Sequence, residues 1–323
     1  MKLHRRQFLQ SVAGAASLPA ALRIARAQNY PVRPVRIIVG YPAGTAPDII
    51  ARLVGQGLSE RLAQQFVIDS RPGAATNIAV EVAVKSPPDG YTLLMVGATN
   101  AINATLYANL SFNVVHDVAA VASIGGTPFV MVVNSSLPAK TVPEFIAYAK
   151  ANPGKINMAS AGNGTAPHVF GELFKMMADV NMLHVPYRGN YMPDLLSGQV
   201  QVMFTAIGTV IEYIRDGKLR ALAVTSARRV GALPNVSTMG EFVPGYEASG
   251  WLGIGAPKSI STEIIERLNN EINAVITEPN FKVRAVELGV EPFSMTSAQF
   301  SQFIVDETKK WATVIKFAGI KPE

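Results

Sequence analysis

The residues that could bind a ligand form two similar loops, not a catalytic cluster. The sequence Gly-Thr-Ala-Pro occurs at residues 44–47 and again at 164–167, each time between an apolar run and a helical pattern. The Thr is suited to cap a helix, and the Pro stands in the first turn, where its missing N–H is not needed. A helix N-terminus offers free N–H groups and about half a unit of positive charge to an anion. The pair of loops therefore predicts an anion site, although the same pattern is also good capping chemistry for a turn.

Five side chains beside these loops are candidate contacts. Asp48 has the spacing of a capping box, so we expect its carboxylate to turn back to the N–H of the preceding Thr, away from an anion that it would repel. His168 either donates to a ligand or covers the first turn of its helix. Tyr41 either covers an apolar part of a ligand or packs in the core. Thr99 and Asn100 follow a strand that ends at the same sheet edge, which makes them further candidates.

Patterns typical of enzymes are mostly missing. Ser160 lies in Met-Ala-Ser-Ala-Gly and lacks the leading Gly of a nucleophile elbow. Residues 162–167 begin like a dinucleotide-binding loop but have Pro at the last Gly position. The four histidines, at positions 4, 116, 168 and 184, are not paired at helical spacing, and the chain has no cysteine. We therefore expect no catalytic residues, no metal and no cofactor.

The segment 1–27 has the features of an export signal. Arg5-Arg6 precede Phe8-Leu9, an apolar run of small residues covers 11–22, and Ala-Arg-Ala at 25–27 fits a signal-peptidase site. The apolar run is too short to span a membrane. The paired arginines resemble a twin-arginine signal, and an ordinary secretory leader is the alternative. Both predict a periplasmic protein after removal of the signal peptide.

Without this leader the charge is nearly balanced. Five of the 29 basic residues lie in residues 1–27, which hold no acidic residue, so the rest carries 24 basic against 23 acidic residues. This balance, without a basic stripe, argues against a nucleic-acid partner. The remaining 296 of the 323 residues exceed the usual size of a single core, so we expect two lobes.

Strand-like apolar runs alternate with helical patterns, which favours parallel sheets covered by helices. We expect strands at 35–41, 66–69, 92–97, 129–134, 156–160, 182–186, 200–206, 219–226 and 251–256. We expect helices at 48–62, 75–85, 142–151, 168–178, 262–277, 281–288 and 298–317. The late return to helices suggests that the C-terminal segment packs back on the first lobe, with crossings near 125–128 and 247–251.

Further motifs lie in order along residues 30–320. They are Tyr-Pro-Val-Arg-Pro-Val-Arg-Ile-Ile-Val from residue 30, Arg-Pro-Gly-Ala at 71–74, Pro-Asp-Gly-Tyr-Thr-Leu-Leu at 88–94, Ala-Ile-Asn at 101–103 with Leu-Tyr at 106–107, His-Val-Pro-Tyr-Arg-Gly at 184–189, Asp-Leu-Leu-Ser-Gly-Gln-Val at 194–200 and Gly-Lys-Leu-Arg-Ala-Leu-Ala-Val-Thr-Ser at 217–226. Together these motifs resemble Bug/TctC-type receptors, the solute-binding components of tripartite tricarboxylate transporters.

The resemblance implies an α/β fold with two lobes, the type II periplasmic binding protein fold, which closes on its ligand like a flytrap. We expect mostly parallel sheets covered by helices. Lobe 1 would comprise residues 28–126 and 249–323, and lobe 2 residues 127–248.

Family members hold a ligand carboxylate mainly through backbone amides and waters, in loops that correspond here to 41–48 and 160–168. The candidate ligand-binding residues are therefore Tyr41, Ala43, Gly44, Thr45, Ala46, Asp48, Thr99, Asn100, Ser160, Gly162, Asn163, Gly164, Thr165, His168 and Thr205.

The sequence also departs from the family pattern. The family usually has Gly where Thr45 stands, Gly-Gly where Ala75-Thr76 stand and Asp where Thr205 stands, and often Asp where Gln201 stands. Thr45 and Thr205 border the expected cleft, so the identity of the ligand does not follow from the resemblance.

The resulting hypothesis is a monomeric receptor that delivers a small organic acid to a membrane transporter. A sensor component that hands its ligand-bound state to a signalling partner is one alternative. An enzyme on the same two-lobed scaffold is another, because a fold does not fix a function.

Overall fold

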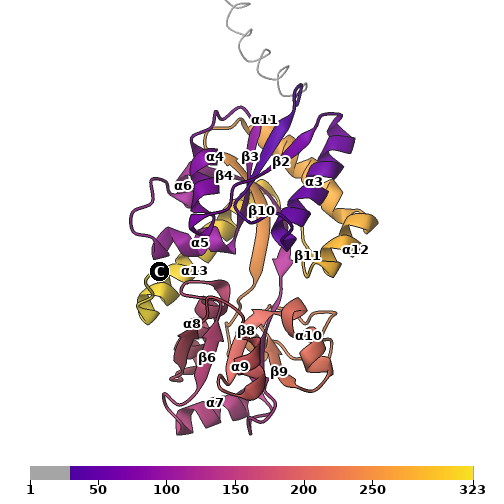
Figure 1. The fold of residues 1–323 in the computed structure, drawn as a ribbon. Helices are drawn as coiled ribbons and strands as arrows, with labels where there is room; N and C mark the ends of the chain where they lie inside the picture. The colour runs from indigo at the N-terminus through magenta and orange to yellow at the C-terminus, as the bar shows by residue number, and fades with distance from the viewer. Residues whose placement is uncertain (1–29, 323) are drawn as a thin grey trace, which may run out of the picture.

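The computed structural model describes residues 30–322, which form two α/β lobes, one above the other, joined by extended strands (Figure 1). The predicted signal peptide at 1–27 lies outside the described residues. Among the residues that are described, no helix is long and apolar enough to cross a membrane.

Lobe 1 is a six-stranded sheet with helices on both faces. Its strands, in order across the sheet, are β11 (Glu291–Pro292), β4 (Val118–Thr127), β10 (Gly250–Pro257), β3 (Thr92–Gly97), β1 (Val35–Val39) and β2 (Phe66–Ser70). Its helices are α3 (Ala46–Leu62), η1 (Ala74–Thr76), α4 (Asn77–Val84), α5 (Ala98–Leu106), α6 (Val114–Asp117), α11 (Thr262–Thr277), α12 (Pro279–Glu287) and α13 (Ser297–Ala318). Alternation along β1 fills both faces: Ile37 packs in the core with α3 and α11, and Ile38 in the core with α4 and α5.

Lobe 2 is a five-stranded sheet. Its strands, in order, are β7 (Leu183–Pro186), β6 (Asn157–Ser160), β8 (Val202–Ala206), β5 (Phe129–Asn134) and β9 (Leu219–Val224). Its helices are α7 (Val142–Ala151), α8 (Ala166–Ala178), α9 (Met192–Ser197), α10 (Ile207–Arg215) and η2 (Met239–Glu241).

Both sheets are mixed, not mostly parallel as the alternation predicts. Parallel pairing is confined to β2-β1-β3 and to β7-β6-β8, which are linked by strand–helix–strand units. In contrast, β10 is antiparallel to β3 and β4, and β5 is antiparallel to β8 and β9. Strand β5 carries the chain into lobe 2, and β10 carries it back into lobe 1. Both strands therefore run antiparallel to their neighbours.

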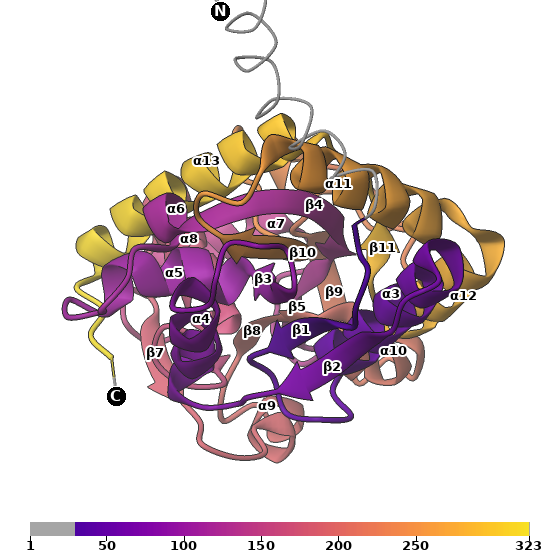
Figure 2. The same cartoon turned by 90° about the horizontal axis from the view of Figure 1, so that it is seen from above.

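The lobes are linked at three places. The chain leaves lobe 1 through β4, Pro128 and β5, and it returns at the start of β10, where Trp251 lies opposite Gly126. The third link is α13, which packs against α5 and β4 in lobe 1 and against α8 in lobe 2 (Figures 1 and 2). The sequence predicted the first two links and not the third. The exact lobe boundaries, after residues 126 and 248, stay a prediction. The division of the strands between the two sheets supports it.

Candidate ligand-binding site

The first loop, residues 41–48 (loop 1), joins β1 to α3. Thr45 has extended backbone at the N-cap position, but its hydroxyl donates to the Pro42 carbonyl at 2.7 Å and does not cap the helix. Oδ2 of Asp48 accepts the N–H of Gly44 at 3.0 Å. The expected bond from Thr45 N–H to Asp48 does not form, because that N–H donates to the Pro42 carbonyl at 3.3 Å. The carboxylate does turn back into the loop, one residue earlier than predicted.

The second loop, residues 160–168 (loop 2), repeats this geometry between β6 and α8. The Thr165 hydroxyl donates to the Gly162 carbonyl at 2.8 Å, and its backbone is extended like that of the Thr in loop 1. The N–H of Gly164 donates to Nδ1 of His168 at 3.1 Å. His168 therefore takes the structural place that Asp48 has in loop 1, and the repeat in sequence is also a repeat in three dimensions.

Each loop leaves the same backbone donors available. The first helical hydrogen bonds run from Ile49 and Val169 to the carbonyls of the two capping threonines, both at 3.0 Å. Within residues 30–322, no acceptor pairs with the N–H groups of Ala46, Asp48, Ala166 or His168. Two N–H groups at the positive end of each helix can thus bind an anion without any Arg or Lys.

A buried carboxylate stands behind loop 1. Asp48 is only 1% exposed, and its two oxygens also accept from Arg52 at 2.9 and 3.2 Å and from the Ser70 hydroxyl at 2.7 Å. Burial opposes ionisation of Asp48, but the hydrogen bonds from Arg52, Gly44 and Ser70 outweigh it and lower the pKa to about 2. Loop 1 is therefore backed by a negative charge, which the half-exposed Arg52 offsets.

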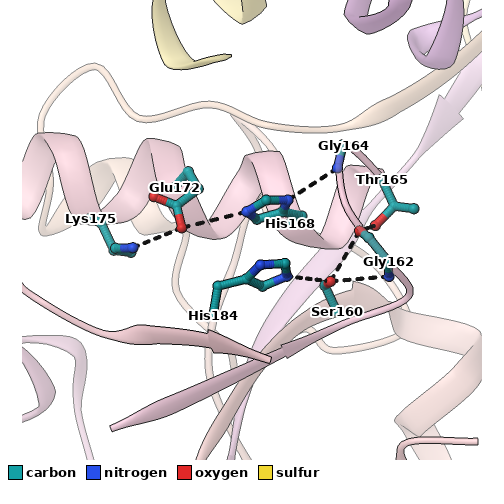
Figure 3. A network of polar contacts seen from close by, with 8 residues as sticks. All are labelled: Ser160, Gly162, Gly164, Thr165, His168, Glu172, Lys175 and His184. Atoms are coloured by element: carbon teal, nitrogen blue, oxygen red, sulfur yellow. Dashed lines mark hydrogen bonds and ion pairs between the residues drawn. The ribbon is translucent and has the colours of Figure 1, made fainter. Parts of the chain in front are cut away.

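A chain of polar side chains stands behind loop 2 (Figure 3). The rings of His168 and His184 stack with centroids 3.5 Å apart, and Nε2 of His184 lies 2.6 Å from the Ser160 hydroxyl. On the other side, Nε2 of His168 lies 3.7 Å from Glu172, which is bound by Lys175 at 2.8 Å. The chain connects β6, β7 and α8 and so fixes loop 2 to the body of lobe 2.

The histidines behind loop 2 differ in charge from Asp48. Because His168 accepts through Nδ1, its hydrogen is on Nε2, toward Glu172. Burial lowers the pKa of His184 to about 4, so this ring is uncharged at neutral pH. Burial opposes ionisation of Glu172, but contacts with His168 and Lys175 outweigh it and lower its pKa. The negative charge behind loop 2 is thus one helical turn farther from the N–H donors than in loop 1.

Ser160 and His184 have the composition of a nucleophile–base pair. The Ser is fully buried, however, and its oxygen accepts the Gly162 N–H at 3.1 Å. Its hydroxyl also lies 3.1 Å from the Gly162 carbonyl. We assign the pair to the support of loop 2.

The other predicted residues fall into different surroundings. The Tyr41 hydroxyl reaches Thr99 at 3.4 Å, so these two side chains do come together. Asn100 is buried, and its side-chain amide makes hydrogen bonds inside lobe 1. Its oxygen accepts the Gly97 N–H at 2.8 Å, and its nitrogen donates to the Thr76 hydroxyl at 2.9 Å. Two further predicted residues differ in exposure. Ala43 is exposed in loop 1, whereas Thr205 is buried on β8.

A cavity of about 620 Å³ adjoins loop 2. Its lining includes Asn163 of loop 2, four members of the polar chain behind that loop (His168, Glu172, Lys175 and His184) and the C-terminal residues 317–322. None of the residues of loop 1 lines it. At the border with lobe 1, a Cβ on Gly164 would overlap the side chain of Leu106 in α5, so loop 2 lies directly against lobe 1.

The residues that support the two loops were not among those predicted from the sequence. Arg52 follows Asp48, and Glu172 follows His168, by four positions, which places each pair on one helix face. This spacing of four residues is visible in the sequence, so both pairs could have been predicted. His184 could not be placed, because its contact with Ser160 depends on the order of strands in the sheet.

Two α/β lobes linked by paired strands, with ligand-type loops at helix N-termini, define the periplasmic binding protein fold. The family model described as the tripartite tricarboxylate transporter family receptor matches residues 50–320, and the chain belongs to this family. The resemblance read from the sequence and the two-lobed fold class are both confirmed. The members of this family are binding proteins for transport.

Similar proteins share nearly the whole chain. BugT of Bordetella pertussis is 34% identical over 300 residues, which cover 91% of this chain and 92% of BugT. A solved structure of an R. palustris protein with adipate is 33% identical, with a TM-score of 0.74 over 91% of this chain and 100% of that one. MatC from Rhodopseudomonas palustris, with bound malate, is 25% identical, with a TM-score of 0.71 over 88% and 100% of the two chains.

Proposed function

We propose that this protein is a periplasmic receptor that captures a small carboxylate-bearing molecule between its lobes and delivers it to a tripartite tricarboxylate-type transporter. The observation that carries the proposal is the matched pair of loops. Each presents two backbone N–H groups without a protein acceptor among the described residues, at the positive end of a helix. Such donors suit a carboxylate and require no charge from the protein.

The relatives support the same class of ligand. Adipate and malate, the molecules in the two solved structures, both carry two carboxylates. The contact of Gly164 with Leu106 places loop 2 at the border between the lobes, where a ligand held by both lobes must lie. The export signal expected at 1–27 supports a location in the periplasm.

The two loops differ in what stands behind them. The ionised Asp48 directly supports loop 1, whereas an uncharged imidazole takes its place in loop 2. A fully charged carboxylate is therefore favoured at loop 2. Loop 1 suits a second carboxylate less well than loop 2 does. A hydroxyl or carbonyl group of the ligand is better suited to loop 1.

Native mass spectrometry of the protein without residues 1–27, followed by calorimetry against mono-, di- and tricarboxylates, tests the proposal. We expect one carboxylate to bind at about micromolar affinity, near −8 kcal/mol. Binding of no carboxylate would overturn the proposal, and chemical conversion of the bound molecule would support an enzyme instead.

A further inference from the structure

Both tryptophans of the chain donate to one oxygen of a buried carboxylate. The indole N–H groups of Trp251 and Trp311 lie 3.1 and 3.0 Å from Oε2 of Glu307. Glu307 is 7% exposed, Trp251 3% and Trp311 0%. Removing a carboxylate from water is costly unless hydrogen bonds replace the lost solvation. The two indole N–H groups supply such hydrogen bonds and so fix the position of the Glu307 carboxylate.

The three side chains lie where the lobes are linked. Trp251 stands on β10 opposite Gly126, and its ring packs edge-to-face on Phe300 and Phe303 of α13. These contacts fasten α13 to the strand by which the chain re-enters lobe 1.

Trp311 faces the other lobe. One helical turn after Glu307, its ring stacks on Phe170 of α8 with centroids 5.1 Å apart. Phe170 in turn packs edge-on against Phe129 at the start of β5. The ring contact of Trp311 with Phe170 is therefore one of the contacts by which α13 meets lobe 2.

Lys310 completes the cluster. Its ammonium group pairs with Oε1 of Glu307, lies 4.6 Å from the centroid of the Trp311 ring, and donates to the Glu247 carbonyl at 3.2 Å. Glu247 lies just before the second crossing between lobes. One carboxylate thus organises the crossing strand, the bridging helix and the aromatic surface of that helix toward lobe 2.

We infer that Glu307 is a positioning residue for lobe closure, an inference that rests on the proposed function. Glu307 holds α13 and β10 together as one piece of lobe 1 and orients Trp311, against which Phe170 turns when lobe 2 closes. Without the carboxylate, the lobes sample more orientations before binding, and closing on a ligand costs more.

Tryptophan fluorescence of the mature protein, titrated with the dicarboxylates adipate and malate, tests the inference. Trp251→Phe leaves Trp311 as the reporter, and we expect it to keep the emission change that ligand causes. Trp311→Phe leaves Trp251, which stays within lobe 1, and we expect this change to be lost. The opposite pattern would place the moving contact elsewhere and overturn the inference.

The role of the carboxylate is tested by affinity. Glu307→Leu should weaken binding roughly tenfold or more, because two buried N–H donors lose their acceptor. Glu307→Gln keeps an acceptor and should stay within about threefold of wild type. Asp306→Leu, which removes an exposed carboxylate from the same helix, is the control.

The outcomes separate the two proposals. If the wild-type protein binds none of the carboxylates, the proposed function fails. If it binds and Glu307→Leu binds equally well, the inference alone fails. If Glu307→Leu does not fold, as judged by circular dichroism, the two Trp→Phe variants still decide.

Discussion

Asp48 and His168 show that one backbone task can be done by side chains of different charge. Each accepts the N–H of the Gly four residues earlier, at 3.0 and 3.1 Å, and each stands in the first turn of its helix. The loops therefore share their shape, while the electrostatic potential at the two helix N-termini differs. Substitutions at equivalent positions of the two loops should reveal this difference.

An acidic side chain at the first helical position should affect binding and stability differently. Ala166→Asp should raise the unfolding free energy by about 0.3–1 kcal/mol through the helix dipole, whereas Ala46→Asp should not, because the ionised Asp48 is adjacent. Both variants should lose at least roughly tenfold in carboxylate affinity, since the new charge competes with the ligand for the same N–H groups. Calorimetry and thermal melting measure the two effects.

Asn at the same two positions is the uncharged control and should leave affinity within about threefold of wild type. Wild-type affinity in both Asp variants would mean that the loops are only well-capped turns. Loss in only one of them would assign the ligand to a single lobe.

His184 should make stability fall as the pH drops below neutrality. Its pKa is lowered from 6.5 to about 4 in the folded protein, so between these values the unfolded chain takes up a proton that the folded chain does not. The neighbouring groups are His168, Glu172 and Lys175. We expect the unfolding free energy to fall by up to roughly 2–3 kcal/mol between pH 6.5 and 4.5.

Urea unfolding at several pH values measures this effect. His184→Phe keeps a ring stacked on His168 but cannot titrate, so its stability should change less over the same range. Replacing the exposed His116 by Gln should leave the dependence intact. Buried carboxylates such as Asp48, whose pKa is about 2, destabilise the fold only at lower pH.

At the scale of elements, the sequence predicted those whose composition agrees with their environment. The strands at 92–97 and 129–134 and the helices at 142–151 and 262–277 have the predicted bounds. Two of the missed elements, β4 and α10, carry local sequences that disagree with their structure. β4 contains Ala, Ser and a Gly-Gly pair, and it is a strand because β10 and β11 pair with it on either side. α10 begins Ile-Gly-Thr-Val-Ile, which is typical of a strand.

The candidate site divides in the same way. The loops themselves were predictable, because the helix-capping pattern is local in sequence. Their support was not, because Ser70 and His184 reach the loops from neighbouring strands.

The predicted helix at 75–85 begins later than expected, and this has a consequence for stability. Ala74, Ala75 and Thr76 all have left-handed backbone, with φ of 46°, 50° and 76°, before α4 starts. Asn103 donates to the Ala75 carbonyl at 2.7 Å, and Asn100 donates to the Thr76 hydroxyl, so two buried amides hold the segment. The family usually has Gly-Gly at 75–76, where this conformation is not strained.

Ala75→Gly should therefore stabilise the protein. The left-handed conformation costs a non-Gly residue about 1–2 kcal/mol, and the greater freedom of Gly in the unfolded chain takes back part of the gain. We expect a net increase of roughly 0.5–1 kcal/mol in the unfolding free energy, measured with urea. Ala104→Gly, in the interior of α5, should instead lower it by about 1 kcal/mol. A loss in both variants would show that the segment is not strained.

At the scale of the whole molecule, lobe 2 is held to lobe 1 by more than the two crossing strands. Helix α13 forms a third link through Trp311 and Phe170. Loop 2 adds a direct contact, since Gly164 lies against Leu106 of lobe 1. Any rearrangement of the lobes must therefore change the surroundings of loop 2.

The equivalence of the two loops provides a test of that contact. Gly44 and Gly164 have similar φ, +81° and +71°, but a Cβ on Gly44 would meet nothing within 4 Å, whereas one on Gly164 would overlap Leu106. Gly44→Ala should cost only the backbone strain, about 1–2 kcal/mol of stability. Gly164→Ala should cost more and should also weaken carboxylate binding, because it pushes loop 2 away from lobe 1.

Leu106→Val makes room for the added methyl, so combining it with Gly164→Ala should cost less than the sum of the two single changes. Calorimetry and urea unfolding on the four variants measure both quantities. Equal effects of the two Gly substitutions, with strictly additive changes at Leu106, would mean that loop 2 does not depend on lobe 1 for its position.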